Sequence, residues 1–146
     1  MLNINRSALV PYSCKQMYQL VDDITSYKEF LPWCGASVEH KRDDSMVEAT
    51  VTIAKGSINK AFTTRNSLQE NKRIEMQLLD GPFKKLHGFW YFEPLRENAS
   101  KISLELEFEF SNRLVGLAIG PIFNQIANTM VDSFVERAHF KYKEET

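Results

Sequence analysis

The sequence has little of what metal binding, disulfide bonding or nucleotide binding requires. Only Cys14 and Cys34 are cysteines among 146 residues, far apart and outside any CxxC pattern, so we expect two reduced thiols in a cytosolic protein. The histidines His40, His87 and His139 stand singly and lack the paired spacing of a zinc site. No glycine pattern matches a Walker or dinucleotide loop. These absences argue against a metal site, a disulfide framework and a nucleotide site.

The sequence also lacks an excess of charge of one sign and long hydrophobic runs. Eighteen Lys and Arg residues face 19 Asp and Glu residues, and the net charge of −1 gives no basic footprint for DNA. The N-terminus lacks the apolar core of a signal peptide, and no run approaches the roughly 18 apolar residues of a membrane span. We therefore expect a soluble chain that contacts a membrane only at its surface. Its length fits one domain, residues 1–146.

The first third of the chain predicts a strand followed by two short helices. Residues 2–10 alternate in polarity before Pro11, which predicts a strand. Ser13 stands where a helix N-cap would, and Thr25 or Ser26 can cap a second short helix that Pro32 stops. The apolar residues at helical spacing in these two segments are Met17, Leu20, Val21, Ile24, Tyr27, Phe30 and Leu31.

Two-residue alternation then persists from Trp33 to about residue 110 and predicts six antiparallel strands. Turn signals at 55–57, 70–72, 80–82 and 97–100 separate most of them. After Asn112 the spacing becomes helical, and Gly120 with Pro121 can kink, restart or gate this helix. The predicted buried stripe of the helix contains Ile119, Phe123, Ile126, Met130 and Phe134.

This element order predicts an α+β protein in which a curved antiparallel sheet of about seven strands wraps around a long C-terminal helix. Such an arrangement leaves a space between sheet and helix, and ligand cavities of this kind are lined mostly by apolar side chains. The alternative is that the same side chains simply fill the core. The candidate cavity residues are Phe30, Trp33, Phe62, Met76, Phe83, Trp90, Phe92, Phe108, Phe123 and Met130.

Residues 80–92, DGPFKKLHGFWYF, form the densest aromatic segment and have apolar side chains on both predicted faces, so the strand needs two covers. Lys84 and Lys85 predict a basic rim, which with Lys55 and Arg65 can contact anionic lipid headgroups or ribosomal RNA phosphates. Solvated lysines are the alternative. His87 would need a carboxylate to act as a base, and Asp80 is near in sequence but across a predicted turn.

A nucleophilic role for Cys34 would require a neighbouring base or cation that the sequence does not identify. With no orienting partner for His87 either, we identify no catalytic acid and base pair. We therefore expect a protein without catalytic residues and with no required cofactor.

Two motifs resemble a known family. Residues 27–34, YKEFLPWC, and residues 80–86, DGPFKKL, with Gly88, Trp90 and Phe92 following, are similar to the paired motifs of the coenzyme Q-binding, polyketide cyclase-like branch of the START superfamily. Residues 8–13 and 62–66 extend the similarity over nearly the whole chain. The resemblance implies a helix-grip (START/Bet v 1-like) fold and strengthens the expectation of a cavity.

The resemblance also implies two competing functions. Quinone-binding members bind isoprenoid quinones such as ubiquinone and support respiration, and Trp33 in FLPWC is similar to that branch. A second group consists of bacterial ribosome-association toxins that bind the large ribosomal subunit. The implied partners are thus a hydrophobic small molecule or quinone and the large subunit, in the cytoplasm or at the inner membrane surface. The alternative is a polyketide cyclase/dehydrase-type enzyme acting on a hydrophobic substrate, although the family offers no agreed catalytic residues.

Overall fold

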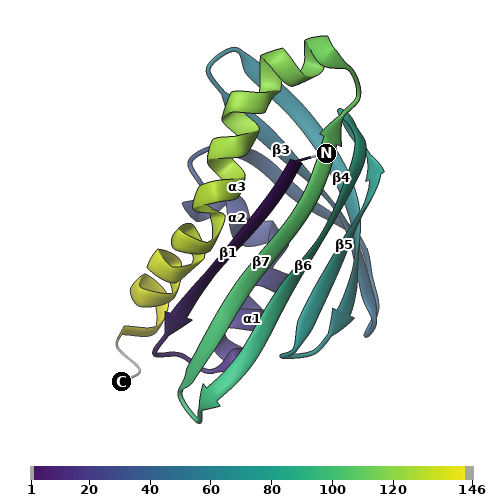
Figure 1. Cartoon of the computed structure of the whole chain (residues 1–146). Helices are drawn as coiled ribbons and strands as arrows, with labels where there is room; N and C mark the ends of the chain where they lie inside the picture. Colours follow the sequence, from purple (N-terminus) through teal and green to yellow (C-terminus); the bar gives the residue numbers. More distant parts are fainter. Residues whose placement is uncertain (1, 144–146) are drawn as a thin grey trace.

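A computed structural model describes residues 2–143 and shows one seven-stranded antiparallel sheet wrapped around a long C-terminal helix (Figure 1). The strands follow the order β1-β7-β6-β5-β4-β3-β2, so β1 and β2 form the edges. The elements are β1 Leu2–Val10, α1 Cys14–Asp22, the 3-10 helix η1 Ile24–Ser26, α2 Tyr27–Phe30, β2 Cys34–Arg42, β3 Met46–Lys55, β4 Ile58–Gln69, β5 Arg73–Asp80, β6 Phe83–Arg96, β7 Ala99–Phe110 and α3 Arg113–Tyr142. The predicted α+β helix-grip fold is confirmed.

The sheet has one buried and one wetter face because its strands alternate in polarity. In β7, Ile102, Leu104 and Phe108 are buried, while Glu105 and Glu107 between them are exposed. The predicted turns also form. Gly56 and Asn71 adopt the left-handed backbone that tight turns need, with φ of 60° and 62°.

The connection between β1 and β2 contains α1, which begins as predicted at Ser13. The Ser13 Oγ accepts from the Gln16 backbone N–H at 3.1 Å, and the Gln16 side chain accepts from the Ser13 N–H at 2.9 Å, which completes a capping box. Two details differ from the sequence prediction. Helix α1 ends at Asp22, so Ile24 lies in η1. The Ser26 hydroxyl donates to Asp23 and does not cap α2.

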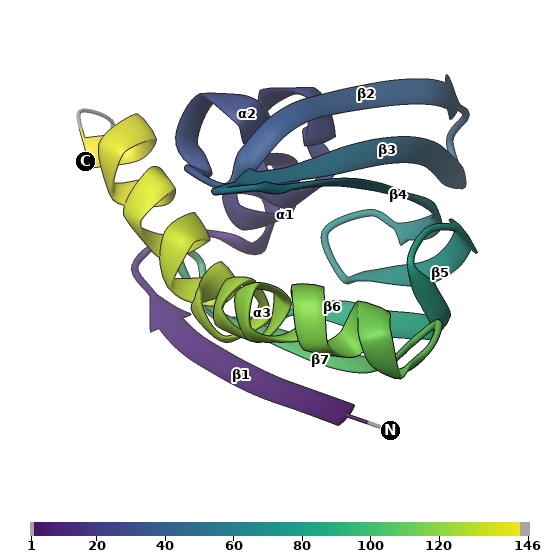
Figure 2. The ribbon, with the colours of Figure 1, turned by 90° about the horizontal axis from the view of Figure 1, so that it is seen from above.

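Helix α3 covers the concave face of the sheet (Figure 2). Its N-cap is Asn112, whose Oδ1 accepts from the Val115 N–H at 2.9 Å. The helix continues through Pro121 for 30 residues instead of restarting there, and Figure 2 shows that its axis changes direction along its length. On the predicted stripe Ile119, Phe123, Ile126 and Phe134 are buried, and Met130 is half-buried.

By length and composition alone, α3 is apolar enough to cross a bilayer. The core helix of a soluble protein meets the same criterion, and the inner side of α3 packs on the sheet. Leu114 and Leu117 in its first two turns are 78% and 68% exposed, which gives the helix two outward apolar side chains. One third of the most apolar 18-residue window of α3 is buried.

Candidate functional site

The concave face of the sheet and α3 enclose a cavity of about 100 Å³. Its walls are almost entirely apolar, and Ile24 of η1 and Tyr27 of α2 contribute to them. The lining residues are Ile24, Tyr27, Trp33, Ala49, Val51, Ile53, Phe62, Thr64, Asn66, Met76, Leu86, Trp90, Leu104, Leu106, Phe123, Ile126, Ala127, Met130 and Phe134. A dry void of about 150 Å³ can hold benzene. This cavity is therefore smaller than one aromatic ring needs.

Six of the ten candidate cavity residues line this space, namely Trp33, Phe62, Met76, Trp90, Phe123 and Met130. The other four lie elsewhere. Phe83 and Phe108 pack edge-on against Phe123 in the core, with ring centroids 4.9 and 4.8 Å away, and Phe92 packs against Tyr18 at 5.5 Å. Phe30 lies in a surface hollow beneath the Arg137 guanidinium, 5.0 Å from its ring centroid. These four stabilise the shell around the cavity.

The sequence reasoning missed the polar part of the wall, Thr64 and Asn66. Both belong to β4, where Phe62, Thr64, Asn66 and Leu68 share the inward parity. Two polar residues at inward positions of an otherwise apolar alternation were the signal that could have identified them. They give the cavity its only polar groups besides tyrosine and tryptophan side chains, among the lining residues described.

Tyr27 is the one titratable side chain of the described lining. Its hydroxyl donates to the Val21 carbonyl oxygen, and burial raises the pKa of the phenol, with Asp22 and Asp23 adding to the effect. A neutral, hydrogen-bonded phenol is a poor acid or base near neutral pH. The cavity therefore offers shape and apolar surface but no proton-transfer group.

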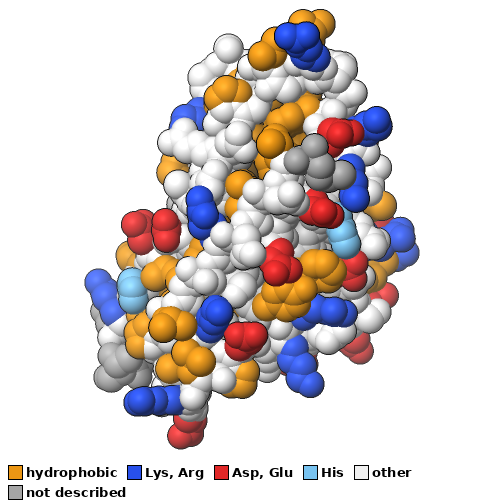
Figure 3. All heavy atoms as spheres, in the orientation of Figure 1, with side chains coloured by type: hydrophobic (Ala, Val, Ile, Leu, Met, Phe, Trp, Pro, Cys, Tyr) orange, Lys and Arg blue, Asp and Glu red, His pale blue; other side chains and the backbone are white. Residues whose placement is uncertain are grey.

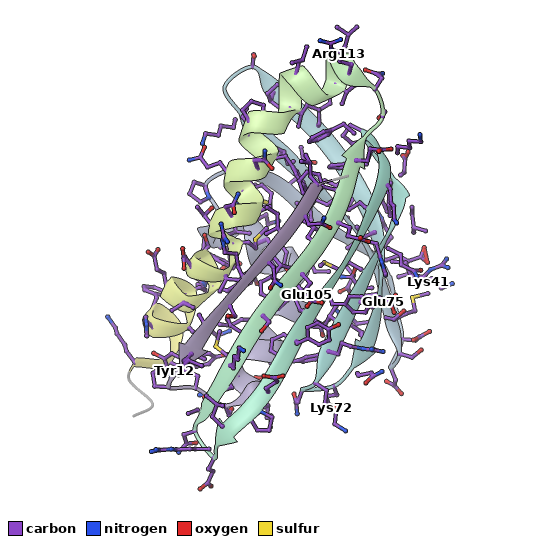
Figure 4. All side chains as sticks on the ribbon, viewed as in Figure 1. Tyr12, Lys41, Lys72, Glu75, Glu105 and Arg113 are labelled. Atoms are coloured by element: carbon purple, nitrogen blue, oxygen red, sulfur yellow. The ribbon has the colours of Figure 1, made fainter. Side chains whose placement is uncertain are left out.

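The remaining chemical candidates, His87 and Cys34, lie outside the cavity lining. The His87 Nε2 lies 2.7 Å from the Glu75 Oε2 on β5, so the orienting carboxylate is Glu75 and not Asp80. Glu75 lies on the outer face of the sheet with Glu105 (Figure 4). Burial raises the pKa of the Cys34 thiol, which disfavours the nucleophilic thiolate, and both cysteines are free. Within residues 2–143 no group of three or more metal-ligating side chains forms.

Other side chains cover both faces of residues 89–92, as the sequence predicts that they must. Trp90 and Phe92 are buried in the core, whereas Phe89 and Tyr91 lie half-buried on the outer face and stack with centroids 5.5 Å apart. The His87 ring and the Arg73 guanidinium cover Phe89 at 5.0 and 5.6 Å. The outer cover consists of neighbouring side chains of the sheet itself.

Each of the four predicted contact cations has an acidic or polar partner. The pairs are Lys84 with Glu109 at 3.6 Å, Lys85 with Glu107 at 3.7 Å, Arg65 with Glu48 at 3.4 Å and Lys55 with Gln125 at 3.2 Å. Lys55 reaches α3, whereas Arg65 and Lys85 extend from the outer face of the sheet, so the four do not form one basic surface. Figure 3 likewise shows acidic and basic side chains interspersed over the face that it presents.

Comparisons with known proteins agree with this architecture. Residues 10–135 match the family described as polyketide cyclase / dehydrase and lipid transport. The ribosome association toxin RatA of Pseudomonas aeruginosa is 49% identical over 96% of this chain and 97% of its own length. The mitochondrial coenzyme Q-binding protein COQ10 of Drosophila melanogaster is 27% identical over 90% of this chain and 56% of its own.

Solved structures of START-like proteins share the fold. The Zhui aromatase/cyclase from Streptomyces sp. R1128 superposes with a TM-score of 0.83 at 10% identity, over 94% of this chain and 93% of that protein. A START superfamily protein from Mycobacterium smegmatis gives 0.79 at 16% identity, over 99% of both chains. At these identities the likeness concerns the fold alone. The family match and the relatives together establish that the chain belongs to the polyketide cyclase/dehydrase and lipid transport family and is similar, within it, to the RatA toxins.

Proposed function

We propose that this protein is a ribosome-association factor of the RatA type, which binds the large ribosomal subunit and opposes its joining with the small one. The observation that carries this proposal is 49% identity with a protein named ribosome association toxin RatA over nearly the full length of both chains. The role is non-catalytic and needs no cofactor. The absence of an acid and base pair from the described cavity lining supports a non-catalytic role. Binding to ribosomes would locate the protein in the cytoplasm.

The ribosomal contact would use cations that surface ion pairs hold only weakly. Lys84 and Lys85 have exposed side chains within 3.7 Å of glutamates on β7, and such exposed pairs contribute about 0–1 kcal/mol. A phosphate can therefore replace the glutamate as the partner. With Arg65 on the same outer face, about three phosphate contacts are available, which corresponds to a logarithmic salt slope of roughly −2 to −3.

Co-sedimentation with purified large subunits tests this proposal. We expect binding that weakens with salt and a weaker affinity for Lys84→Glu. The matched control is Lys72→Glu, which makes the same charge change at an exposed position in the turn between β4 and β5 (Figure 4). Lys72 lies at the opposite end of β5 from Lys84. Absence of wild-type co-sedimentation at low salt would contradict the proposal. Equal losses for both variants would refute the specific role of Lys84.

A second function, binding of an apolar ligand such as an isoprenoid quinone, is favoured by the cavity itself. Trp33, Trp90, Phe62 and Phe123 provide aromatic walls, and a distant relative is named as a coenzyme Q-binding protein. The cavity must widen to take a ring, and the helix around Pro121 lacks one backbone donor, which favours opening there. Contact with the inner membrane surface would give access to such a ligand.

Native mass spectrometry of protein purified from its own host tests the ligand proposal. The expected result is a bound quinone or similar apolar molecule. Trp90→Ala should weaken quinone binding far more than Lys84→Ala, because Trp90 is 3% exposed and forms part of the cavity wall, whereas the Lys84 side chain is 74% exposed. Equal effects of the two substitutions would indicate a surface contact instead. Repeated recovery of empty protein would argue against the ligand.

A further inference from the structure

Strand β4 places an amide in the middle of the apolar cavity wall. Asn66 lines the cavity and is 8% exposed. The Thr64 hydroxyl donates to Asn66 Oδ1 at 3.0 Å, which uses the amide's acceptor and fixes its orientation. Among residues 2–143, Asn66 Nδ2 forms no hydrogen bond. The wall thus presents a buried amide whose two N–H groups have no partner among the described residues.

The Nδ2 atom of Asn66 is not fully enclosed by protein. Within the described part of the chain, no fully enclosed side-chain nitrogen or oxygen lacks a hydrogen-bond partner. An unpartnered Nδ2 therefore keeps some accessible surface, and the hollow that Asn66 lines is the cavity. A donor at such a place is poorly solvated, and a bound acceptor would restore the hydrogen bond that burial removed.

The fold itself gives Asn66 no structural task that explains an amide. It lies inside β4, away from the turns at both ends of that strand, and its cross-strand neighbours are Val47 on β3 and Met76 on β5. Both neighbours are apolar and offer no side-chain acceptor of ordinary strength. An apolar side chain at position 66 would match the rest of the wall better.

We propose that Asn66, oriented by Thr64, donates a hydrogen bond from Nδ2 to a carbonyl oxygen of an apolar aromatic ligand held in this cavity. The inference rests on the proposed ligand binding. Aromatic walls favour a flat ring, and a donor at the wall selects an acceptor oxygen. Because the described lining has no Lys, Arg or His, a carboxylate would remain unpaired, which selects ketones and quinones over fatty acids.

The cavity can adapt to a ring larger than its present volume. Met76 and Met130 lie in the wall and are only half-buried, and unbranched thioether side chains rearrange at low cost. A small bicyclic quinone is therefore a suitable probe, since it demands less widening than a quinone with a long isoprenoid tail.

A matched pair of probes tests the hydrogen bond separately from cavity binding. 2-Methyl-1,4-naphthoquinone and 2-methylnaphthalene share a carbon framework and differ in the two carbonyl groups. Calorimetric titration of the wild-type protein should give about tenfold tighter binding of the quinone, as one hydrogen bond to a buried donor supplies. Asn66→Leu should remove that preference while retaining affinity for 2-methylnaphthalene. Ser67→Leu, an exposed outward position on the same strand, should change neither affinity.

The outcomes separate the two claims. Equal affinity of wild-type protein for both probes, unaltered by Asn66→Leu, would overturn the role of Asn66 and leave ligand binding intact. Binding of neither probe would overturn both. If Asn66→Leu does not fold, as judged by circular dichroism, Thr64→Val takes its place, since it keeps the side-chain shape and removes the orienting hydroxyl. It should then reduce the preference for the quinone, and an unchanged preference would count against the proposal.

Discussion

Filling the cavity from its helical wall should stabilise the protein and exclude its ligand. Ala127 on α3 is 2% exposed and lines the cavity. Ala127→Leu adds three carbon atoms directed at a void of about 100 Å³. At about 0.8 kcal/mol for each buried carbon group, their burial is worth at most about 2.4 kcal/mol. Because the larger side chain will not fit the void perfectly, part of this free energy is lost, and we expect a net stabilisation of about 1 kcal/mol.

The control is the same substitution three turns further along the same helix. Ala138 is 0% exposed and packs in the core group between α1, α3 and the sheet, away from the cavity lining. Ala138→Leu therefore overpacks and should cost about 1–3 kcal/mol. Urea unfolding, followed by the fluorescence of Trp33 and Trp90, measures both values. Similar destabilisation by the two variants would refute the view that Ala127 borders usable space, and retained naphthoquinone binding by Ala127→Leu would refute the location of the ligand.

Three further predictions concern stability. Ser13→Ala removes the capping box of α1 and should lower the unfolding free energy by about 1 kcal/mol in urea, whereas the exposed Ser67→Ala should leave it unchanged. Ser100→Ala removes a buried donor to the Tyr12 carbonyl oxygen and should cost about 1–3 kcal/mol; a smaller loss would mean that water satisfies that carbonyl. Burial and then Asp22 raise the pKa of Tyr18 to about 12, so its contribution to stability is present below pH 10 and lost as pH rises through about 12. Tyr18→Phe should reduce the decrease in unfolding free energy at alkaline pH, measured by urea unfolding at a series of pH values. An unchanged pH dependence would contradict this prediction.

Much of the fold was predictable because the spacing of apolar residues along the sequence indicates which face of a strand or helix is buried. The two-residue period of β7 and the helical stripe from Ile119 to Phe134 identified both layers and their facing sides. The cap at Ser13 and the turn at Gly56 followed from local chemistry, which acts over a few residues. Helix α3 did not restart at Pro121, because packing on the sheet maintains a helix whose lost hydrogen bond alone would favour a break.

The candidate site was only partly predictable because cavity and core have the same composition. Strict alternation would put Phe83 and Trp90 on opposite faces, and a register shift between Phe83 and Lys85 is what turns Phe83 inward. Only Trp90 borders the void, which depends on how α3 approaches the sheet. The partner of His87 also escaped prediction, because Glu75 comes from the adjacent strand β5, twelve residues away in sequence. Asn66 was detectable in principle, since its inward parity is a local property.

The most direct test of the proposed ribosome association is a sucrose-gradient profile of ribosomes mixed with the purified protein. We expect the protein to migrate with the large subunit and the peak of joined ribosomes to decline while the free-subunit peaks grow. A protein that stays at the top of the gradient at low salt, with an unchanged peak of joined ribosomes, would contradict the proposed function.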